Sequence, residues 1–275
     1  MNGIRPVKLE AIRKEYIWGT EEWLFSALHE ECSTVPLLIK KITANEALSV
    51  QVHPNDEFAK AEEGCSGKTE MWYVLDCEPD AYLYYGLKHQ ISPNEFQKRI
   101  QNGTITEVCR KMPVKKGDVF YIPAGLVHAI GKGITVAEVQ QSSNITYRIF
   151  DYLREDEKGQ RRELHISKAA QVAGFRPPLQ GHRPMGLCQK KEGYEKTLLV
   201  QCPYFIVNHY RVKTVMDSRE GENALAIYVI EGKGTLSVEN ETMELNAGDC
   251  IFVPKEVKNY EIRGKLEILI SEVPK

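Results

Sequence analysis

The chain has 275 residues, of which 42% are hydrophobic and 27% are charged, as in ordinary globular proteins. A formal net charge of −2 supplies no basic field for neutralising phosphates, which argues against nucleic-acid binding. No long apolar run occurs and the N-terminus is polar, so neither a membrane span nor a secretory signal is predicted. Seven scattered cysteines without a C-x-x-C pair predict reduced thiols in a cytoplasmic protein.

Most of the chain is predicted to form short strands separated by turns. In the first half, the strand-like runs cover residues 37–42, 48–53, 71–75, 81–85, 119–122, 135–140 and 146–150. In the second half, they cover residues 204–207, 226–230, 235–238, 250–253 and 266–270. Many short β-rich runs at regular spacing favour a sandwich, barrel or jelly roll.

Two short helices interrupt this pattern. Ser92 suits an N-cap and Pro93 a first helical turn, and the first helix is expected to stop at Gly103. A second helix is expected over residues 167–173. Residues 174–193 have little apolar periodicity, which indicates a linker or an ordered wrap over the surface.

A weak internal repeat links the two halves. Residues 116–123 (KGDVFYIP) and 247–254 (AGDCIFVP) share the pattern G-D-x-x-x-(I/V)-P, in which glycine and aspartate favour a turn and proline ends a strand. The repeat predicts two related β domains. His128 follows the first copy, whereas no histidine follows the second, so only the first half offers a metal-ligand candidate there.

The first half also contains other metal-binding side chains. Gln51 and His53 are two residues apart and share one face of a strand, Glu70 opens the next strand, and His128 lies beyond a strand end. Two imidazoles, one carboxylate and one amide oxygen suit zinc or another borderline divalent metal. Such a site keeps an open position for water or substrate oxygens.

These residues also have a purely structural interpretation. A single histidine in a strand is more often a core or edge residue than a metal ligand. The remaining histidines lack comparable partners and are interpreted as surface or structural residues: His29, His89, His165, His182 and His209. The aromatic residues of the first half are interpreted as barrel core: Trp72, Tyr73, Tyr82, Tyr84 and Tyr85.

Four segments in order resemble type I mannose-6-phosphate isomerases, which are cupins. They are residues 49–56 (SVQVHPND), 67–73 (GKTEMWY), 122–129 (IPAGLVHA) and 138–152 (EVQQSSNITYRIFDY). The resemblance extends over most of residues 10–275. It implies an enzyme that interconverts mannose 6-phosphate and fructose 6-phosphate with one bound zinc ion.

The resemblance also implies roles for individual residues. The family's metal-ligand positions correspond to Gln51, His53, Glu70 and His128, of which the Gln51 position varies among short bacterial relatives. The family's active-site arginine, substrate-handling lysine and acidic pocket residue correspond to Arg148, Lys68 and Glu138.

Aldose–ketose isomerisation moves a proton between neighbouring carbons through a cis-enediol intermediate. Zinc stabilises the negative charge that develops on oxygen, and an acid–base group carries the proton. Glu138, Lys68 and a zinc-bound water remain open as the base. Arg148 is expected to stabilise the enediolate or to fix the phosphate through paired hydrogen bonds.

The sequence departs from the family at two places. Residues 20–35 are compressed where the family has a longer segment with a helical insertion, which affects a lid or a pocket wall. Asn144 stands where the family has an aspartate, so a charged contact that orients Arg148 would be weakened.

The predicted fold is mainly β: a double-stranded β-helix (cupin or jelly roll) repeated as a bicupin, with a few short helices. Residues 1–185 are expected to form the catalytic, metal-binding cupin and residues 186–275 a metal-free cupin. The expected partner is a small sugar phosphate, without nucleic acid or membrane, and the chain is expected to be a monomer or homodimer. Two alternatives remain: another metal-dependent cupin enzyme, such as an oxygenase or a different phosphosugar isomerase, and a non-catalytic sugar-phosphate-binding relative.

Overall fold

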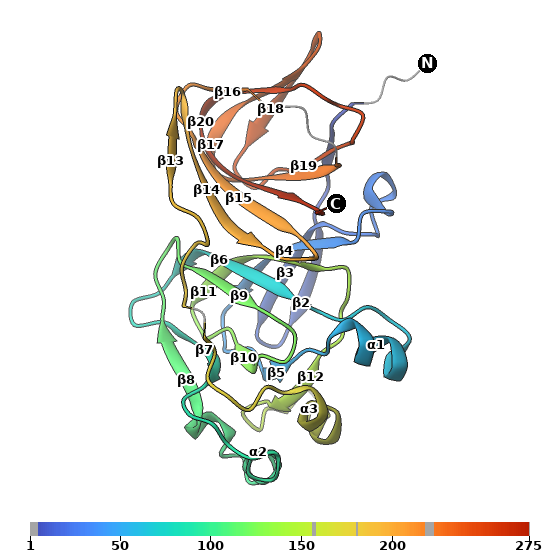
Figure 1. Cartoon of the computed structure of the whole chain (residues 1–275), viewed down its shortest axis with the longest axis vertical. Helices are drawn as coiled ribbons and strands as arrows, with labels where there is room; N and C mark the ends of the chain where they lie inside the picture. The colour runs from blue at the N-terminus through green and yellow to red at the C-terminus, as the bar shows by residue number, and fades with distance from the viewer. Residues whose placement is uncertain (1–4, 156–157, 180, 218–222, 275) are drawn as a thin grey trace. The chain divides into compact units, whose positions relative to one another are not determined.

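A computed structural model describes residues 5–155, 158–179, 181–217 and 223–274. The chain divides into two compact units (Figure 1). Unit 1 comprises residues 1–12, 22–40 and 183–275, and unit 2 comprises residues 13–21 and 41–182. Two N-terminal segments therefore belong with the C-terminal half of the chain. Among the described residues, no helix is long and apolar enough to cross a membrane.

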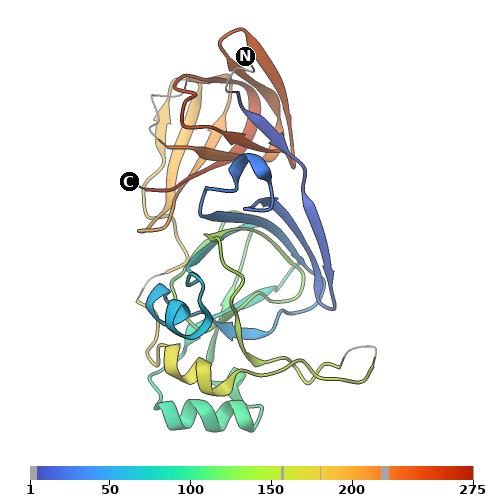
Figure 2. The same ribbon diagram turned by 90° about the vertical axis from the view of Figure 1, so that its right-hand side faces the viewer.

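Unit 2 contains a five-stranded antiparallel sheet with one face covered by helices. In spatial order its strands are β12 (Tyr147–Phe150), β5 (Val50–Val52), β10 (His128–Ala129), β7 (Tyr82–Leu87) and β8 (Cys109–Pro113). Helices α2 (Pro93–Gln101) and α3 (Ile166–Val172) lie side by side under this sheet (Figure 2). Val52 and Ile149 of the sheet share a buried core with Phe96 and Ala169 of the helices.

A six-stranded sheet carries two of the predicted site residues, Glu70 and Glu138. Its strands, in spatial order, are β2 (Ile12–Tyr16), β3 (Gly19–Phe25), β4 (Leu37–Ala44), β11 (Ile134–Gln141), β6 (Glu70–Cys77) and β9 (Val119–Ile122). The boundaries between the two units fall within β2, β3 and β4. Trp72 of β6 and Phe120 of β9 share a buried core with Tyr85 of the five-stranded sheet. The uncovered face of the five-stranded sheet therefore faces β6 and β9 across this core.

Unit 1 is built on a nine-stranded sheet. Its main path is β1 (Val7–Leu9), β19 (Cys250–Val253), β17 (Leu225–Val238), β20 (Glu261–Glu272), β15 (Ile206–Val212), β14 (Tyr194–Gln201) and β13 (Gln189–Lys191). Strand β16 (Val215–Asp217) pairs with β20, and β18 (Glu241–Asn246) pairs with β17. The core of this unit is apolar, with Ile227, Ile251 and Ile268 fully buried.

The two G-D repeats fold in the same way. Gly117 and Gly248 have φ values of 90° and 97°, a region that favours glycine. Each glycine donates its N–H to a carbonyl of the partner strand, at 2.8 and 2.9 Å. Asp118 and Asp249 each accept, through a carboxylate oxygen, the N–H three residues earlier, at 3.0 and 2.7 Å. The repeat seen in the sequence is therefore also a repeat in local structure.

The mainly β class is confirmed, and both predicted helices form. The Ser92 side chain caps α2 by accepting the N–H of Glu95 at 3.1 Å. The runs predicted at 226–230 and 235–238 merge into one strand, β17, and strand β13 begins inside the predicted linker. The strands missed include β2, whose sequence IRKEY is mostly charged and lacks an apolar face.

One helix near the site was also missed, although its capping signals are in the sequence. In α1 (Asp56–Glu63), the Asn55 side chain accepts the N–H of Phe58 at 2.9 Å, and Gly64 ends the helix with φ 67°. The two 3₁₀ turns, η1 (Glu30–Cys32) and η2 (Ile105–Glu107), lie in loops.

Candidate metal centre

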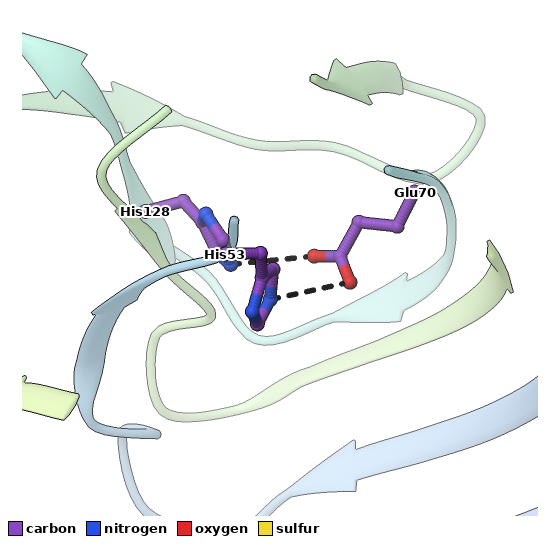
Figure 3. Close-up of side chains that lie close together, drawn as sticks. All are labelled: His53, Glu70 and His128. Atoms are coloured by element: carbon purple, nitrogen blue, oxygen red, sulfur yellow. Dashed lines mark ion pairs between the residues drawn. The ribbon is translucent and has the colours of Figure 1, made fainter. Parts of the chain in front are cut away.

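Three of the predicted ligands converge inside unit 2. The ligand atoms of His53, Glu70 and His128 all lie within 4.8 Å of one another, and both imidazoles face the carboxylate (Figure 3). Glu70 Oε2 is 3.6 Å from His53 Nε2, and Glu70 Oε1 is 3.3 Å from His128 Nε2. The three side chains are at most 1% exposed, so this cluster of polar groups lies within the core.

Strand register brings Gln51 and Arg148 to the sheet face that carries His128. Gln51 of β5 lies directly opposite His128 of β10 on one side and opposite Arg148 of β12 on the other. Side chains that are directly opposite in an antiparallel pair share one face of the sheet. Gln51 Nε2 accordingly lies 3.3 Å from His128 Nε2. Of the predicted site residues, only Gln51 and Arg148 keep partial exposure, so the site faces solvent at their end.

The hydrogen bonding of His128 fixes its tautomer. Its Nδ1 lies 2.7 Å from the carbonyl oxygen of Leu126, which only accepts, so Nδ1 must carry the proton. Burial lowers the pKa of His128 to about 4, which keeps the ring neutral. Nε2 therefore presents a lone pair to Glu70 Oε1. Two electron-pair donors 3.3 Å apart suit a cation between them, and a backbone carbonyl on Nδ1 is the usual support for a ligating histidine.

Lys68 and Glu138 extend the cluster. Lys68 Nζ lies 3.0 Å from Glu70 Oε2 and 4.0 Å from Glu138 Oε1. Burial alone lowers the pKa of Lys68, but the charges of Glu70 and Glu138 more than offset burial and raise that pKa. Trp72 Nε1 donates to Glu138 Oε2 at 2.9 Å. Two buried carboxyl groups thus face one ammonium, and a bound divalent cation would compensate the excess negative charge.

A close backbone approach positions Lys68. A Cβ atom on Gly67 would lie 2.4 to 2.8 Å from backbone atoms of residues 54–56, so only glycine fits there. The N–H of Gly67 donates to Asp56 Oδ1 at 2.8 Å, and Gln141 Nε2 donates to the same oxygen at 2.9 Å. These contacts hold the segment before β6 against the turn that follows His53.

Arg148 is held by residues 163 and 165 rather than by residue 144. Its Nη1 donates to the carbonyl oxygen of Glu163 at 3.0 Å, and its own N–H donates to His165 Nδ1 at 3.1 Å. Burial, followed by the charge of Arg162, lowers the pKa of the Arg148 guanidinium. Asn144 is exposed.

All the predicted site residues therefore lie in unit 2: three of them contact the Glu70 carboxylate, Glu138 reaches it through Lys68, and Gln51 and Arg148 join the cluster through strand register. Trp72 was predicted from the sequence to be barrel core, with no role at the site. Trp72 is core, but its indole N–H also orients Glu138. A tryptophan two residues after a candidate ligand, on the same strand face, was the only signal available.

Comparison with known proteins identifies the family. Residues 195–273 match the family described as "Mannose-6-phosphate isomerase, cupin domain". The chain is 36% identical to the mannose-6-phosphate isomerase of Streptococcus mutans, over 98% of this chain and 84% of that protein. It is 37% identical to mannose-6-phosphate isomerase ManA of Bacillus subtilis, over 94% of this chain and 80% of that protein.

Solved structures agree with this assignment. The crystal structure of the mannose 6-phosphate isomerase from Bacillus subtilis superposes with a TM-score of 0.88 at 31% identity, covering 97% of this chain and 99% of that one. A putative mannosephosphate isomerase from Archaeoglobus fulgidus has the same fold, with a TM-score of 0.78 at 18% identity over 99% of both chains. By sequence identity over nearly its whole length and by fold, the chain belongs to the mannose-6-phosphate isomerase family.

Proposed function

We propose that the chain interconverts mannose 6-phosphate and fructose 6-phosphate in the cytoplasm, as a monomer or homodimer. The observation that carries this proposal is the buried cluster of His53, Glu70 and His128, which presents lone pairs to one point in a chain of this family. A cationic group at that point, with Lys68 and Arg148 beside it, suits an anionic sugar phosphate.

Zinc is the metal that we propose for this site. Two histidines and one glutamate form a donor set found in catalytic zinc sites, which keep a further position open. Gln51 is the proposed fourth ligand, because its amide nitrogen lies 3.3 Å from His128 Nε2. Rotating the amide by 180° puts its oxygen in that position. Bound zinc supplies a Lewis acid that polarises a substrate oxygen next to the reacting carbons.

Glu138 is the proposed base. Lys68 carries a raised pKa and stays an ammonium, whereas Glu138 offers a carboxylate whose Oε2 is fixed by Trp72. Glu138 takes the proton from C2 of the aldose and returns it to C1 of the cis-enediol, so no net proton is gained or lost. Lys68 and Arg148 oppose the negative charge that develops on substrate oxygen, and Arg148 lies at the solvent side, where the phosphate enters.

We also propose that unit 1 is a second, metal-free cupin, which makes the chain a bicupin. Counted from the shared G-D turn, Leu225 of unit 1 takes the register position of Glu70, since each pairs with the residue five after the turn glycine. In the same way, Ile270 takes the position of Glu138. Apolar residues at both positions support a structural role for this unit.

A coupled assay of fructose 6-phosphate formed from mannose 6-phosphate tests the proposal. Purified protein is assayed as isolated, after a chelator, and after zinc is added back, with glucose 6-phosphate as a control substrate. Activity that disappears with the chelator and returns with zinc is expected. No turnover at stoichiometric zinc would contradict the proposal, and bound iron in place of zinc would indicate an oxygenase-type site.

A further inference from the structure

Gln140 lies beside the proposed ligand Glu70 and has no assigned role. It is directly opposite Glu70 in the pairing of β11 with β6, so the two side chains share one face. Glu138 is two residues earlier on the same strand and therefore also on that face. Gln140 is fully buried, as Glu70 is. The residue thus belongs to the inner wall that carries the candidate site.

Hydrogen bonds fix the orientation of the Gln140 amide. Its Nε2 donates at 2.8 Å to the carbonyl oxygen of Gln141, and it also donates to the carbonyl oxygen of Ser143. Both amide protons are therefore used on backbone acceptors. Exchanging the nitrogen and the oxygen would place the amide oxygen against two carbonyls, so the orientation is determined by chemistry.

The amide oxygen of Gln140 is left without a donor. Across residues 5–155, 158–179, 181–217 and 223–274, no hydrogen-bond donor reaches Gln140 Oε1, and this atom is buried. An unsatisfied buried acceptor is costly, and proteins keep few of them. Gln140 Oε1 therefore keeps an unused capacity to accept a hydrogen bond, on a residue that shares its sheet face with Glu70 and Glu138.

We infer that Gln140 is a substrate-positioning residue whose Oε1 accepts a hydrogen bond from a hydroxyl of the sugar phosphate. This inference rests on the proposed function. An amide oxygen only accepts, and hydroxyls are the donors that a sugar phosphate offers. The hydroxyl is one on a carbon that does not react, C3 or C4, since the oxygens on C1 and C2 are those that the metal and the acid–base groups act on and the C5 oxygen closes the pyranose ring in which the sugar phosphate binds.

The test compares mannose 6-phosphate with its 3-deoxy and 4-deoxy analogues on the zinc-loaded wild type and on Gln140→Met. Calorimetry gives the Kd for each compound, and the coupled assay gives the turnover. For the wild type, one deoxy analogue is expected to bind about 10- to 100-fold more weakly, the usual effect of leaving a buried acceptor unpaired. In Gln140→Met that ratio is expected to fall to within about twofold, with zinc content unchanged. Structural damage lowers affinity for all three compounds and leaves the ratio intact.

Gln171→Met, a change of an exposed glutamine on α3, is the matched control and is expected to keep the wild-type ratio. Equal affinity of the wild type for all three compounds would overturn the inference even if Gln140→Met does not fold, and would indicate that water takes the acceptor. The same ratio in wild type and Gln140→Met would overturn it as well. Turnover without hydroxyl discrimination contradicts this inference alone, whereas discrimination in binding without turnover contradicts the proposed function alone.

Discussion

Replacing His128 by alanine is expected to abolish the stabilisation of the protein by zinc. His128 is fully buried, its Nδ1 is bonded to the Leu126 carbonyl, and its Nε2 faces Glu70. The variant loses one ligand and leaves the Leu126 carbonyl unsatisfied. Without metal, it is expected to be less stable than wild type by about 2–4 kcal/mol, from the lost packing and the lost hydrogen bond, and to remain folded.

The size of the zinc effect follows from linkage. A metal present at 100 times its Kd stabilises the folded state by about 2.7 kcal/mol. With an unfolding entropy of about 2.1 cal/mol/K per residue, the wild-type midpoint rises by roughly 5 °C if the 275-residue chain unfolds together. It rises by roughly 8 °C if unit 2 unfolds alone, because fewer residues contribute to the entropy. In His128→Ala, zinc is expected to raise the unfolding midpoint by less than about 1 °C.

Differential scanning calorimetry of chelated and zinc-loaded protein measures this shift, and elemental analysis after dialysis measures the bound metal. His89→Ala, a change of an exposed histidine, serves as the control and is expected to keep the wild-type shift. If His128→Ala showed the same zinc-dependent rise and the same zinc content as wild type, the assignment of His128 as a ligand would be refuted.

Three further outcomes are expected. Arg148→Ala keeps zinc and its unfolding midpoint but loses at least about 100-fold in kcat/KM; a rate near wild type would remove Arg148 from the mechanism. Trp72→Phe removes the 2.9 Å hydrogen bond to Glu138 and lowers kcat about tenfold with KM held, which steady-state kinetics measures; an unchanged kcat would contradict this role. Hydrogen bonds from His209 and then from Arg211 lower the pKa of Glu267 from 4.5 to about 2. The charged form is thus favoured in the fold, so this contribution is complete above pH 4.5 and is lost as the pH falls towards 2. When the free energy of unfolding is measured between pH 5 and pH 2, Glu267→Gln should reduce its pH-dependent loss by about 1 kcal/mol. An unchanged loss would argue against the His209–Glu267 pair.

Local patterns in the sequence were sufficient for several features. The run at 119–122 forms β9 and the run at 250–253 forms β19, because apolar residues between turn signals leave few alternatives. Helix α2 begins after Ser92 because a hydroxyl cap followed by proline selects that start. The G-D repeat predicted two similar turns, and both form with the same hydrogen bonds.

Other features depend on contacts between residues that are distant in the chain. The strand β10 places His128 opposite Gln51, but it is only two residues long, too short to give a pattern in the sequence. The orientation of the Gln140 amide is set locally, by carbonyls one and three residues later, but strand pairing with a distant segment places it opposite Glu70. No single-sequence pattern reports whether a buried polar atom has a partner.

The sequence by itself determined which chemical groups the protein carries and the order in which they occur: two imidazoles, two carboxyl groups, a lysine and an arginine in four motifs along one half of the chain. Only the tertiary structure decided that these groups come together between two sheets of unit 2, that two buried carboxyl groups there face one ammonium, and that Leu225 of unit 1 takes the register position of Glu70 in unit 2. The physical reason is that residue type and spacing fix local conformation, whereas register and burial arise from pairing between strands that are far apart in the chain.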